Sequence, residues 1–144
     1  MLQPTLIAKT ALMNEQGEIL ILTRSDTDDR RPGGLDLPGG VVDEGENYEV
    51  AASREIKEEI GVDVAPSDLS LVFSETSYYE RETAIRFLFI AVLKQNTPIT
   101  LSYEHSDSVW MGRQRIVDEY SHPVWVKAIQ YAAEHSLLPV PLAS

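Results

Sequence analysis

The sequence lacks cysteine entirely, and this absence excludes disulfide bonds, zinc–thiolate sites and thiol nucleophiles. Basic residues are also scarce, because 12 Lys and Arg stand against 23 Asp and Glu, which gives a net charge of −11 at pH 7. Nucleic-acid backbones and anionic membranes attract proteins with a basic face, so we expect neither as a partner. A small acidic metabolite can still bind where metal ions neutralise the site.

Long hydrophobic runs are missing as well. The longest, Phe87–Leu93, is far too short to span a bilayer, and Met1–Thr10 lacks the basic start and long apolar run of a signal peptide. The 144 residues are 43% hydrophobic, as in ordinary globular domains. These features predict a single domain over residues 1–144 that is cytoplasmic and either monomeric or homodimeric.

Apolar stretches bounded by polar turns predict the strands. They are Leu6–Met13, Glu18–Thr23, Leu69–Tyr79, Thr83–Leu93, Ile99–Leu101 and Ser108–Met111. The first two flank the polar turn Asn14-Glu15-Gln16-Gly17 and are expected to form a β-hairpin. Ser25–Gly34 is polar and predicts an exposed loop of the kind that often touches substrate. Pro38-Gly39-Gly40 predicts a tight backbone bend.

Two segments have the period of amphipathic helices. In the first, Asn47–Ile60, Asn47 suits the N-cap and Gly61 suits a left-handed end. Its apolar stripe consists of Ala52, Ile56 and Ile60. The second, Val124–Glu134, is expected to bury Val124, Ala128, Tyr131 and Ala132. The order of elements predicts an α/β (α+β) fold, with helices on both faces of a mixed β-sheet.

The first helix carries an unusual concentration of acid. Glu55, Glu58 and Glu59 stand at i, i+3 and i+4, where side chains are neighbours and like charges repel. Such a cluster is costly unless a cation occupies it. Hard divalent ions such as Mg²⁺ are the usual occupants of a carboxylate nest, and they often bring phosphate oxygens with them.

The spacing around this cluster forms a recognisable motif. It reads Gly40, five residues, Glu46, seven residues, then Arg54-Glu55-Ile56-Lys57-Glu58-Glu59-Ile60-Gly61-Val62. This resembles the signature of the Nudix hydrolase family, GX5EX7REUXEEXGU with U aliphatic, at every specified position. A chance match has a probability of about 10⁻¹⁰ per start position. The resemblance implies an α/β/α sandwich with a mixed sheet, and hydrolysis of a nucleoside diphosphate linked to another moiety.

The resemblance also implies roles for the motif residues. Glu55, Glu58 and Glu59 are expected to bind Mg²⁺ or Mn²⁺, helped by the backbone carbonyl of Gly40. Arg54 belongs to the same catalytic set and is expected to brace the loop and the helix through an ion pair with Glu46. Glu46 is therefore expected close to the bound substrate. The identity of the general base stays open.

Candidates outside the motif are weaker. Glu104 resembles a downstream acid that completes the metal site or acts as base in many family members, although it could equally be a solvated loop acid. Its neighbour His105 could orient the site, but a loop histidine is more often a surface residue. Arg24 could contact phosphate or simply be exposed. Tyr79 lies near the position of a tyrosine in some dinucleoside-polyphosphate hydrolases of the family. Arg86, in a strand with apolar neighbours, is expected to face solvent or the substrate groove, with solvent favoured.

For the substrate we expect first an ordinary or oxidised (d)NTP, cleaved to a nucleoside monophosphate and pyrophosphate, because the chain is short for recognition of a large second moiety. ADP-ribose or a nucleotide sugar, and a dinucleoside polyphosphate, remain open. A non-catalytic, nucleotide-sensing Nudix domain is a further alternative. Such domains tend to lose glutamates of the motif over residues 40–62, the Nudix box, and none is lost here. An isoprenyl-diphosphate isomerase of the same fold depends on cysteine, which this chain lacks.

Overall fold

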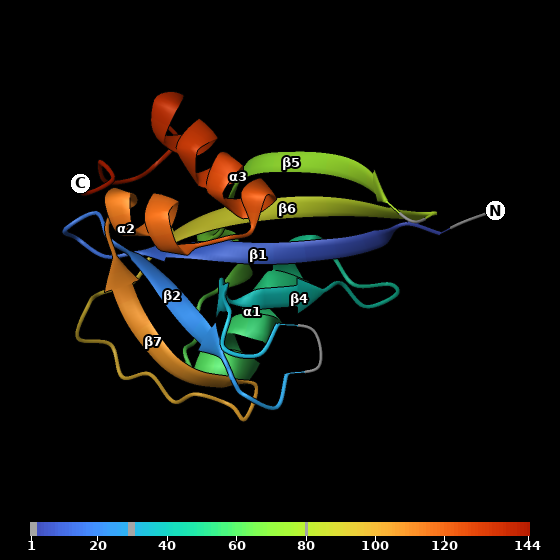
Figure 1. The fold of residues 1–144 in the computed structure, drawn as a ribbon, viewed down its shortest axis with the longest axis horizontal. Helices are drawn as coiled ribbons and strands as arrows, with labels where there is room; N and C mark the ends of the chain where they lie inside the picture. The colour runs from blue at the N-terminus through green and yellow to red at the C-terminus, as the bar shows by residue number, and fades with distance from the viewer. Residues whose placement is uncertain (1–2, 29–30, 80) are drawn as a thin grey trace.

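The computed structural model describes residues 3–28, 31–79 and 81–144 (Figure 1). The strands within these residues are β1 (Thr5–Met13), β2 (Ile19–Arg24), β3 (Leu35–Asp36), β4 (Gly39–Val41), β5 (Ser70–Tyr79), β6 (Glu82–Val92) and β7 (His105–Met111). The helices are α1 (Tyr48–Ile60), α2 (Arg113–Glu119) and α3 (Pro123–Glu134), with a 3-10 turn η1 at Pro66–Asp68. Within the same residues, none of the helices combines the length and apolar character needed to cross a membrane.

Strand β1 lies at the centre of a mixed sheet. Along one edge, residues 5–13 pair in parallel with residues 84–92 of β6, and β5 adds to β6 in antiparallel. The other edge of β1 is shared, because its first half pairs with β4 while Met13 pairs with Ile19 of β2. Strand β2 then pairs with β3 and β7. The sheet therefore divides beside β4, where β2 and β7 turn away from β1 (Figure 1).

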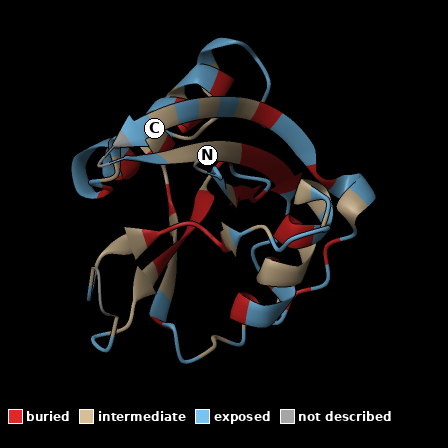
Figure 2. Ribbon diagram, turned by 90° about the vertical axis from the view of Figure 1, so that its right-hand side faces the viewer, coloured by how far each residue is buried: buried red, intermediate tan, exposed pale blue. Residues whose placement is uncertain are grey.

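The sheet lies between two helical layers. Because successive strand residues point to opposite faces, Ala8 and Leu12 of β1 pack in one core cluster with Ile56 of α1. On the other face, Met13 packs in a second cluster with Trp125 of α3. Figure 2 shows the buried residues along the inner strands and on the inward sides of the helices. This arrangement confirms the expected α/β/α sandwich with a mixed sheet.

Most of the predicted elements are confirmed. The hairpin strands, the first helix and the two longer strands all lie within one residue of their expected bounds. Gly61 ends α1 in the left-handed conformation, with φ 72°. Glu80, in the predicted turn between the longer strands, lies outside the described residues.

The prediction of a strand at Ile99–Leu101 is wrong. This segment runs instead across the end of α1, where the backbone N–H of Thr100 donates to the carbonyl of Ile60 at 2.9 Å. The N–H of Ser102 likewise donates to the carbonyl of Glu59 at 3.0 Å. Carbonyls in the last turn of a helix have no partner within the helix, so the segment supplies donors to α1 rather than to the sheet.

Several helix details also differ from the expectations. The side chain of Asn47 makes no capping hydrogen bond to α1, and α2 was not predicted. In α3, Tyr131 is exposed, whereas Trp125 and Ile129 are buried with Ala128 and Ala132. Helix α3 buries the side that contains Trp125 and Ile129 because burial of these large side chains removes more apolar surface from water.

Candidate functional site

Helix α1 is held to the sheet by one side and presents the predicted glutamates on the next. Ile56 and Ile60 are completely buried. The side chain of Glu58 is 56% exposed, that of Glu55 is 16% exposed, and Glu59 as a residue is only 2% exposed. The three carboxylates therefore range from solvent to the protein interior, and two of them lie largely out of water.

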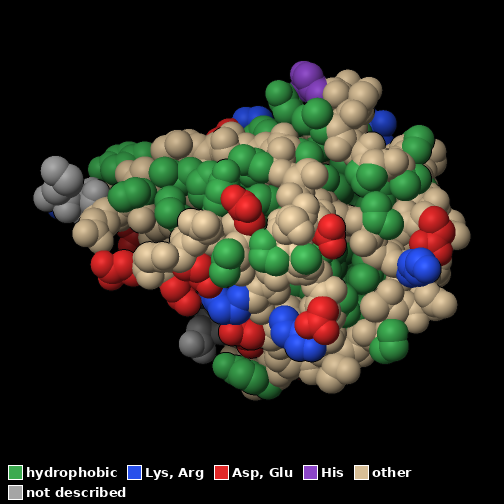
Figure 3. All heavy atoms as spheres, turned by 180° about the vertical axis from the view of Figure 1, so that it is seen from behind, with side chains coloured by type: hydrophobic (Ala, Val, Ile, Leu, Met, Phe, Trp, Pro, Cys, Tyr) green, Lys and Arg blue, Asp and Glu red, His purple; other side chains and the backbone are tan. Residues whose placement is uncertain are grey.

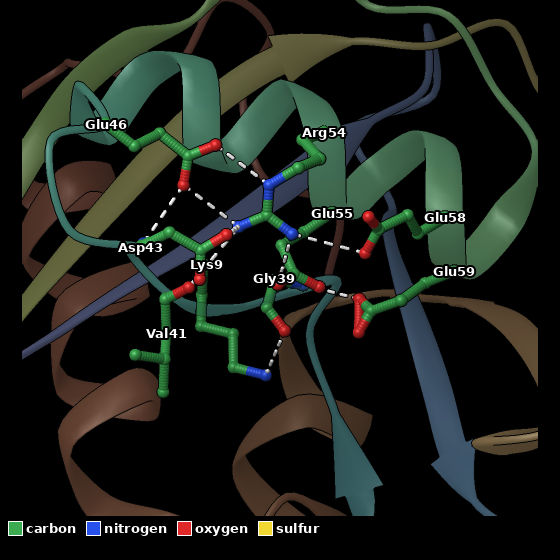
Figure 4. A network of polar contacts seen from close by, with 9 residues as sticks. All are labelled: Lys9, Gly39, Val41, Asp43, Glu46, Arg54, Glu55, Glu58 and Glu59. Atoms are coloured by element: carbon green, nitrogen blue, oxygen red, sulfur yellow. Dashed lines mark hydrogen bonds and ion pairs between the residues drawn. The ribbon is translucent and has the colours of Figure 1, made fainter.

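Arg54 connects these carboxylates to the preceding loop (Figure 4). Its Nε and Nη2 donate to the two carboxylate oxygens of Glu46 at 2.8 and 3.0 Å, which is a bidentate pair. Its Nη1 donates to Glu55 at 3.1 Å and to Glu58 at 3.2 Å. The Glu46 hydrogen bond is the main cause that raises the pKa of Arg54, and the same bond lowers the pKa of Glu46. The predicted ion pair between Glu46 and Arg54 is confirmed.

The glycine bend meets α1 on the buried side. The N–H of Gly39 donates to Oε2 of Glu59 at 2.8 Å. Gly39 has φ 141°, and a Cβ on it would lie 2.1 Å from the carbonyl oxygen of Ala8, so only glycine fits. A Cβ on Gly40 would lie 2.9 Å from Oε1 of Glu55. Gly39 is therefore needed for the bend to pass beside β1, and a side chain at Gly40 would displace the carboxylate of Glu55.

A buried ionic cluster lies beneath this bend, and the sequence reasoning missed it. Lys9 Nζ lies 3.1 Å from an oxygen of Asp36 and donates to the carbonyl of Gly39 at 3.0 Å. Asp36 also lies 3.2 Å from Nε2 of His105 and 3.3 Å from a guanidinium nitrogen of Arg24. Burial acts to raise the pKa of Asp36, but the cationic and hydrogen-bonding neighbours outweigh it and lower the pKa to about 2. The cluster anchors the bend on β1.

Burial has the opposite result for the box carboxylates. It raises the pKa of Glu59 to about 8, despite the charge of Lys9 and the N–H of Gly39. It also raises the pKa of Glu55, despite the neighbouring Arg54. These two groups are therefore desolvated beyond what their present partners compensate. A hard cation would remove that cost.

Mg²⁺ or Mn²⁺ fits this donor set by chemistry, because carboxylate and carbonyl oxygens are the ligands that such ions prefer. The absence of a Cβ at Gly40 keeps its backbone against the carboxylate of Glu55. Within the described part of the chain, no three acidic, His or Cys side chains already gather at metal-binding distance. Arg54 bridges one oxygen of Glu55 and one oxygen of Glu58 instead, which leaves the second oxygen of each carboxylate outside these two contacts.

The remaining predicted residues have varied surroundings. Glu104 is exposed in the turn before β7, and its carbonyl accepts a hydrogen bond from the N–H of Ser25 at 2.9 Å. His105 is buried, at 6% exposure, so the expectation of a surface histidine is wrong, because β7 begins three residues earlier than predicted. Arg24 is bonded to Asp28 at 2.8 Å and is largely covered. The side chain of Tyr79 lies outside the described part of the structure.

A cavity of about 340 Å³ opens on the other side of the bend, a size within the range of small-molecule sites. It is lined by Ile7, Lys9, Arg24, Arg31, Gly40, Val41, Arg86, His122 and Trp125. Of the two surroundings expected for Arg86, open solvent or a groove, the structure agrees with the second, because Arg86 lines this cavity. Its side chain is half-buried, and its Nη1 donates to Oγ of Ser77 at 2.6 Å. The alternation of strand residues could have predicted this position, because Arg86 lies on the same face of β6 as the buried Leu88.

Comparison with known proteins shows that the motif lies within a larger region that matches a known domain. The NUDIX domain model matches residues 4–130 of the chain. An uncharacterised Nudix hydrolase of Yersinia pestis is 35% identical over 120 residues, which cover 78% of this chain and 62% of the relative. The 8-oxo-dGTP diphosphatase of Haemophilus influenzae is 29% identical over 110 residues, covering 76% and 77%. The chain spans less than two thirds of the length of the first curated relatives that it matches.

Solved structures agree on the fold. The MutT protein of Methanosarcina mazei superposes with a TM-score of 0.77 at 24% identity, covering 94% of this chain and 98% of that one. Identity at this level supports the shared architecture rather than a shared substrate.

Proposed function

This chain belongs to the NUDIX domain family, and from that premise we propose that it is a pyrophosphohydrolase that acts on a nucleoside diphosphate linked to another moiety. The observation that carries the proposal is the meeting of the Gly39–Gly40 bend with Glu55 and Glu59, two carboxylates that burial leaves short of positive charge. A divalent ion shared with a diphosphate supplies that charge.

We propose that Glu55, Glu58, Glu59 and the carbonyl of Gly40 hold Mg²⁺ or Mn²⁺. Held by these groups, such an ion would neutralise phosphate oxygens and would make a water molecule more acidic. Glu104 is proposed as a further ligand. Its neighbour His105 contacts Asp36, and Asp36 contacts Lys9, which donates to the carbonyl of Gly39. These contacts connect the turn that carries Glu104 to the glycine bend.

The reaction is a hydrolysis of one phosphoanhydride. The oxygen of a water molecule forms a bond to phosphorus, and the bond from that phosphorus to the bridging oxygen breaks, with its electron pair kept by that oxygen in the departing phosphate group. The proton lost by the water passes to the solvent. Arg54 and Glu46 keep the loop and helix in register during this step. Arg24, at the end of β2, is proposed to contact phosphate oxygens. Tyr79 stays a prediction.

The first substrate to test is a (d)NTP or oxidised NTP, which would give a nucleoside monophosphate and pyrophosphate. The name of the Haemophilus relative, 8-oxo-dGTP diphosphatase, supports this choice. Nucleotide sugars, ADP-ribose and dinucleoside polyphosphates complete the test panel. A non-catalytic nucleotide-binding role is the rival, and the complete set of box glutamates speaks against it.

The test is the appearance of hydrolysis products from this panel, a nucleoside mono- or diphosphate in every case, separated by chromatography after incubation with Mg²⁺, with Mn²⁺ and with chelator. We expect metal-dependent hydrolysis of at least one compound, and a loss of two or more orders of magnitude in Glu58→Gln and Glu59→Gln. Glu134→Gln, an exposed glutamate of α3, is the matched control and should keep full activity. Nucleotide binding without any hydrolysis would favour the rival role. Full activity in both box variants would overturn the metal assignment.

A further inference from the structure

The cavity beside the bend has a charge opposite to that of the whole protein. The chain carries a net charge of −11, yet four of its 12 basic residues line this one space. They are Lys9, Arg24, Arg31 and Arg86, and none of the described residues that line the cavity is acidic. Figure 3 shows the contrasting pattern on the face seen from behind, where Lys and Arg side chains in the lower half lie beside acidic ones.

Arg86 differs from Lys9 and Arg24 in its partner. Lys9 and Arg24 are both compensated by carboxylates, because each lies within 3.3 Å of Asp36. Arg86 is bonded to Ser77, a neutral hydroxyl. The sheet register places Glu75 opposite Arg86, but Oε1 of Glu75 accepts from Nζ of Lys127 at 2.6 Å. A half-buried guanidinium with a neutral partner is costly by itself, which points to an anionic ligand.

Two residues of the cavity wall each carry a buried polar atom without a partner. Nε of Arg24 and Nδ1 of His122 are buried and have no hydrogen-bond partner within the described residues. Buried polar groups are nearly always satisfied. Burial, followed by the charges of Arg31 and Arg86, lowers the pKa of His122 to about 4. The imidazole is therefore neutral at pH 7 and able to pair with a polar ligand atom, and the positive field of the cavity reaches it.

Gly40 connects the cavity to the glutamates. It lines the cavity on one side, and on the other its Cβ position lies against the carboxylate of Glu55. A diphosphate held at the glutamates can therefore extend past Gly40 into the basic space. We infer that this cavity binds an anionic group of the moiety beyond the diphosphate, and that Arg86 determines the specificity for it. The protein then prefers a substrate whose second moiety is itself charged, such as a terminal phosphate, over one with a neutral sugar.

This inference rests on the proposed hydrolysis and is tested with matched substrates. A nucleoside triphosphate and a nucleotide sugar with the same base differ only in the second moiety. Wild type should have the higher kcat/KM for the triphosphate. Arg86→Met should lower that value about tenfold to a hundredfold, as expected for the loss of a charge-assisted hydrogen bond, and should change the value for the sugar less than threefold. Arg86→Lys should fall in between.

Arg115→Met is the control, because it removes the same charge from an exposed ion pair with Glu119 on α2. It should leave both substrates unaffected, and the melting temperatures of all variants should show that they fold. Preference of wild type for the sugar, or equal losses for both substrates in Arg86→Met, would overturn the inference. If no nucleotide is hydrolysed, the proposed function fails, and calorimetric binding of the same two nucleotides still decides the role of Arg86.

Discussion

The raised pKa of Glu59 makes a quantitative prediction about stability in the absence of metal. The folded protein holds the Glu59 proton more tightly than the unfolded chain, because the carboxylate is buried without sufficient positive charge. This stabilisation is complete below pH 4.5, the ordinary value for glutamate, and is lost as the pH rises through about 8. In chelator, the wild-type protein should therefore lose stability between pH 5 and pH 9 through this group.

The size of the effect follows from the two pKa values. A rise from 4.5 to about 8 corresponds to about 5 kcal/mol at most, since one pKa unit is equivalent to about 1.36 kcal/mol. Glu59→Gln is permanently neutral, and its amide oxygen can still accept from the N–H of Gly39. The free energy of unfolding of wild type minus that of this variant should fall by several kcal/mol between pH 5 and pH 9. This subtraction also cancels the opposite contribution of His122, which is lost below its ordinary value of 6.5.

Urea unfolding followed by tryptophan fluorescence measures these free energies. Glu58→Gln, a neighbouring but exposed glutamate, is the control, and its difference from wild type should vary much less with pH. Millimolar Mg²⁺ should restore much of the wild-type stability at pH 8, because an ion that binds only the folded state adds about 2.7 kcal/mol at a hundred times its Kd. A wild-type minus Glu59→Gln difference that stays constant within 1 kcal/mol would refute the desolvation argument.

Two other substitutions test the surroundings of the box. Lys9→Met should lower the free energy of unfolding by about 3 kcal/mol, because it leaves the buried Asp36 short of a cation. Urea unfolding checks this, Lys9→Arg should lose less, and a loss below 1 kcal/mol would contradict it. Glu104→Gln should raise the Mg²⁺ concentration for half-maximal activity several-fold with little change in melting temperature. An unaltered Mg²⁺ titration would remove Glu104 from the proposed ligands.

The parts of the site that the sequence predicts correctly depend on local geometry. The stripe of Ile56 and Ile60 and the left-handed Gly61 follow from helix periodicity and from the conformational freedom of glycine. The bidentate contact between Glu46 and Arg54 joins residues only eight positions apart, and both belong to the motif from which the ion pair was predicted. Such features need no knowledge of the sheet order.

The parts that escape prediction are contacts between distant segments. Asp36 is 27 residues from Lys9 and 69 from His105. The pairing of β1 with β4, and of β2 with β3 and β7, brings these segments together. A lysine inside the apolar run of β1 was the available signal. A buried lysine in a strand requires a partner, although the sequence does not say which one. Helix α2 escaped for a related reason, because Ile116 is its one residue classed as buried and one buried side chain gives no period.

The proposed site joins two halves of opposite charge, and such a site would explain how so acidic a protein takes an anionic substrate. On one side of Gly40, α1 provides carboxylates that attract a divalent cation and repel a bare phosphate. On the other side, Arg86 and its basic neighbours attract the anion that the rest of the surface repels. We expect that neither the carboxylates nor the basic residues alone would hold a diphosphate. With a cation at the glutamates, the negative charge of the substrate has favourable partners along its whole length, and the single glycine between the halves leaves room for it to pass.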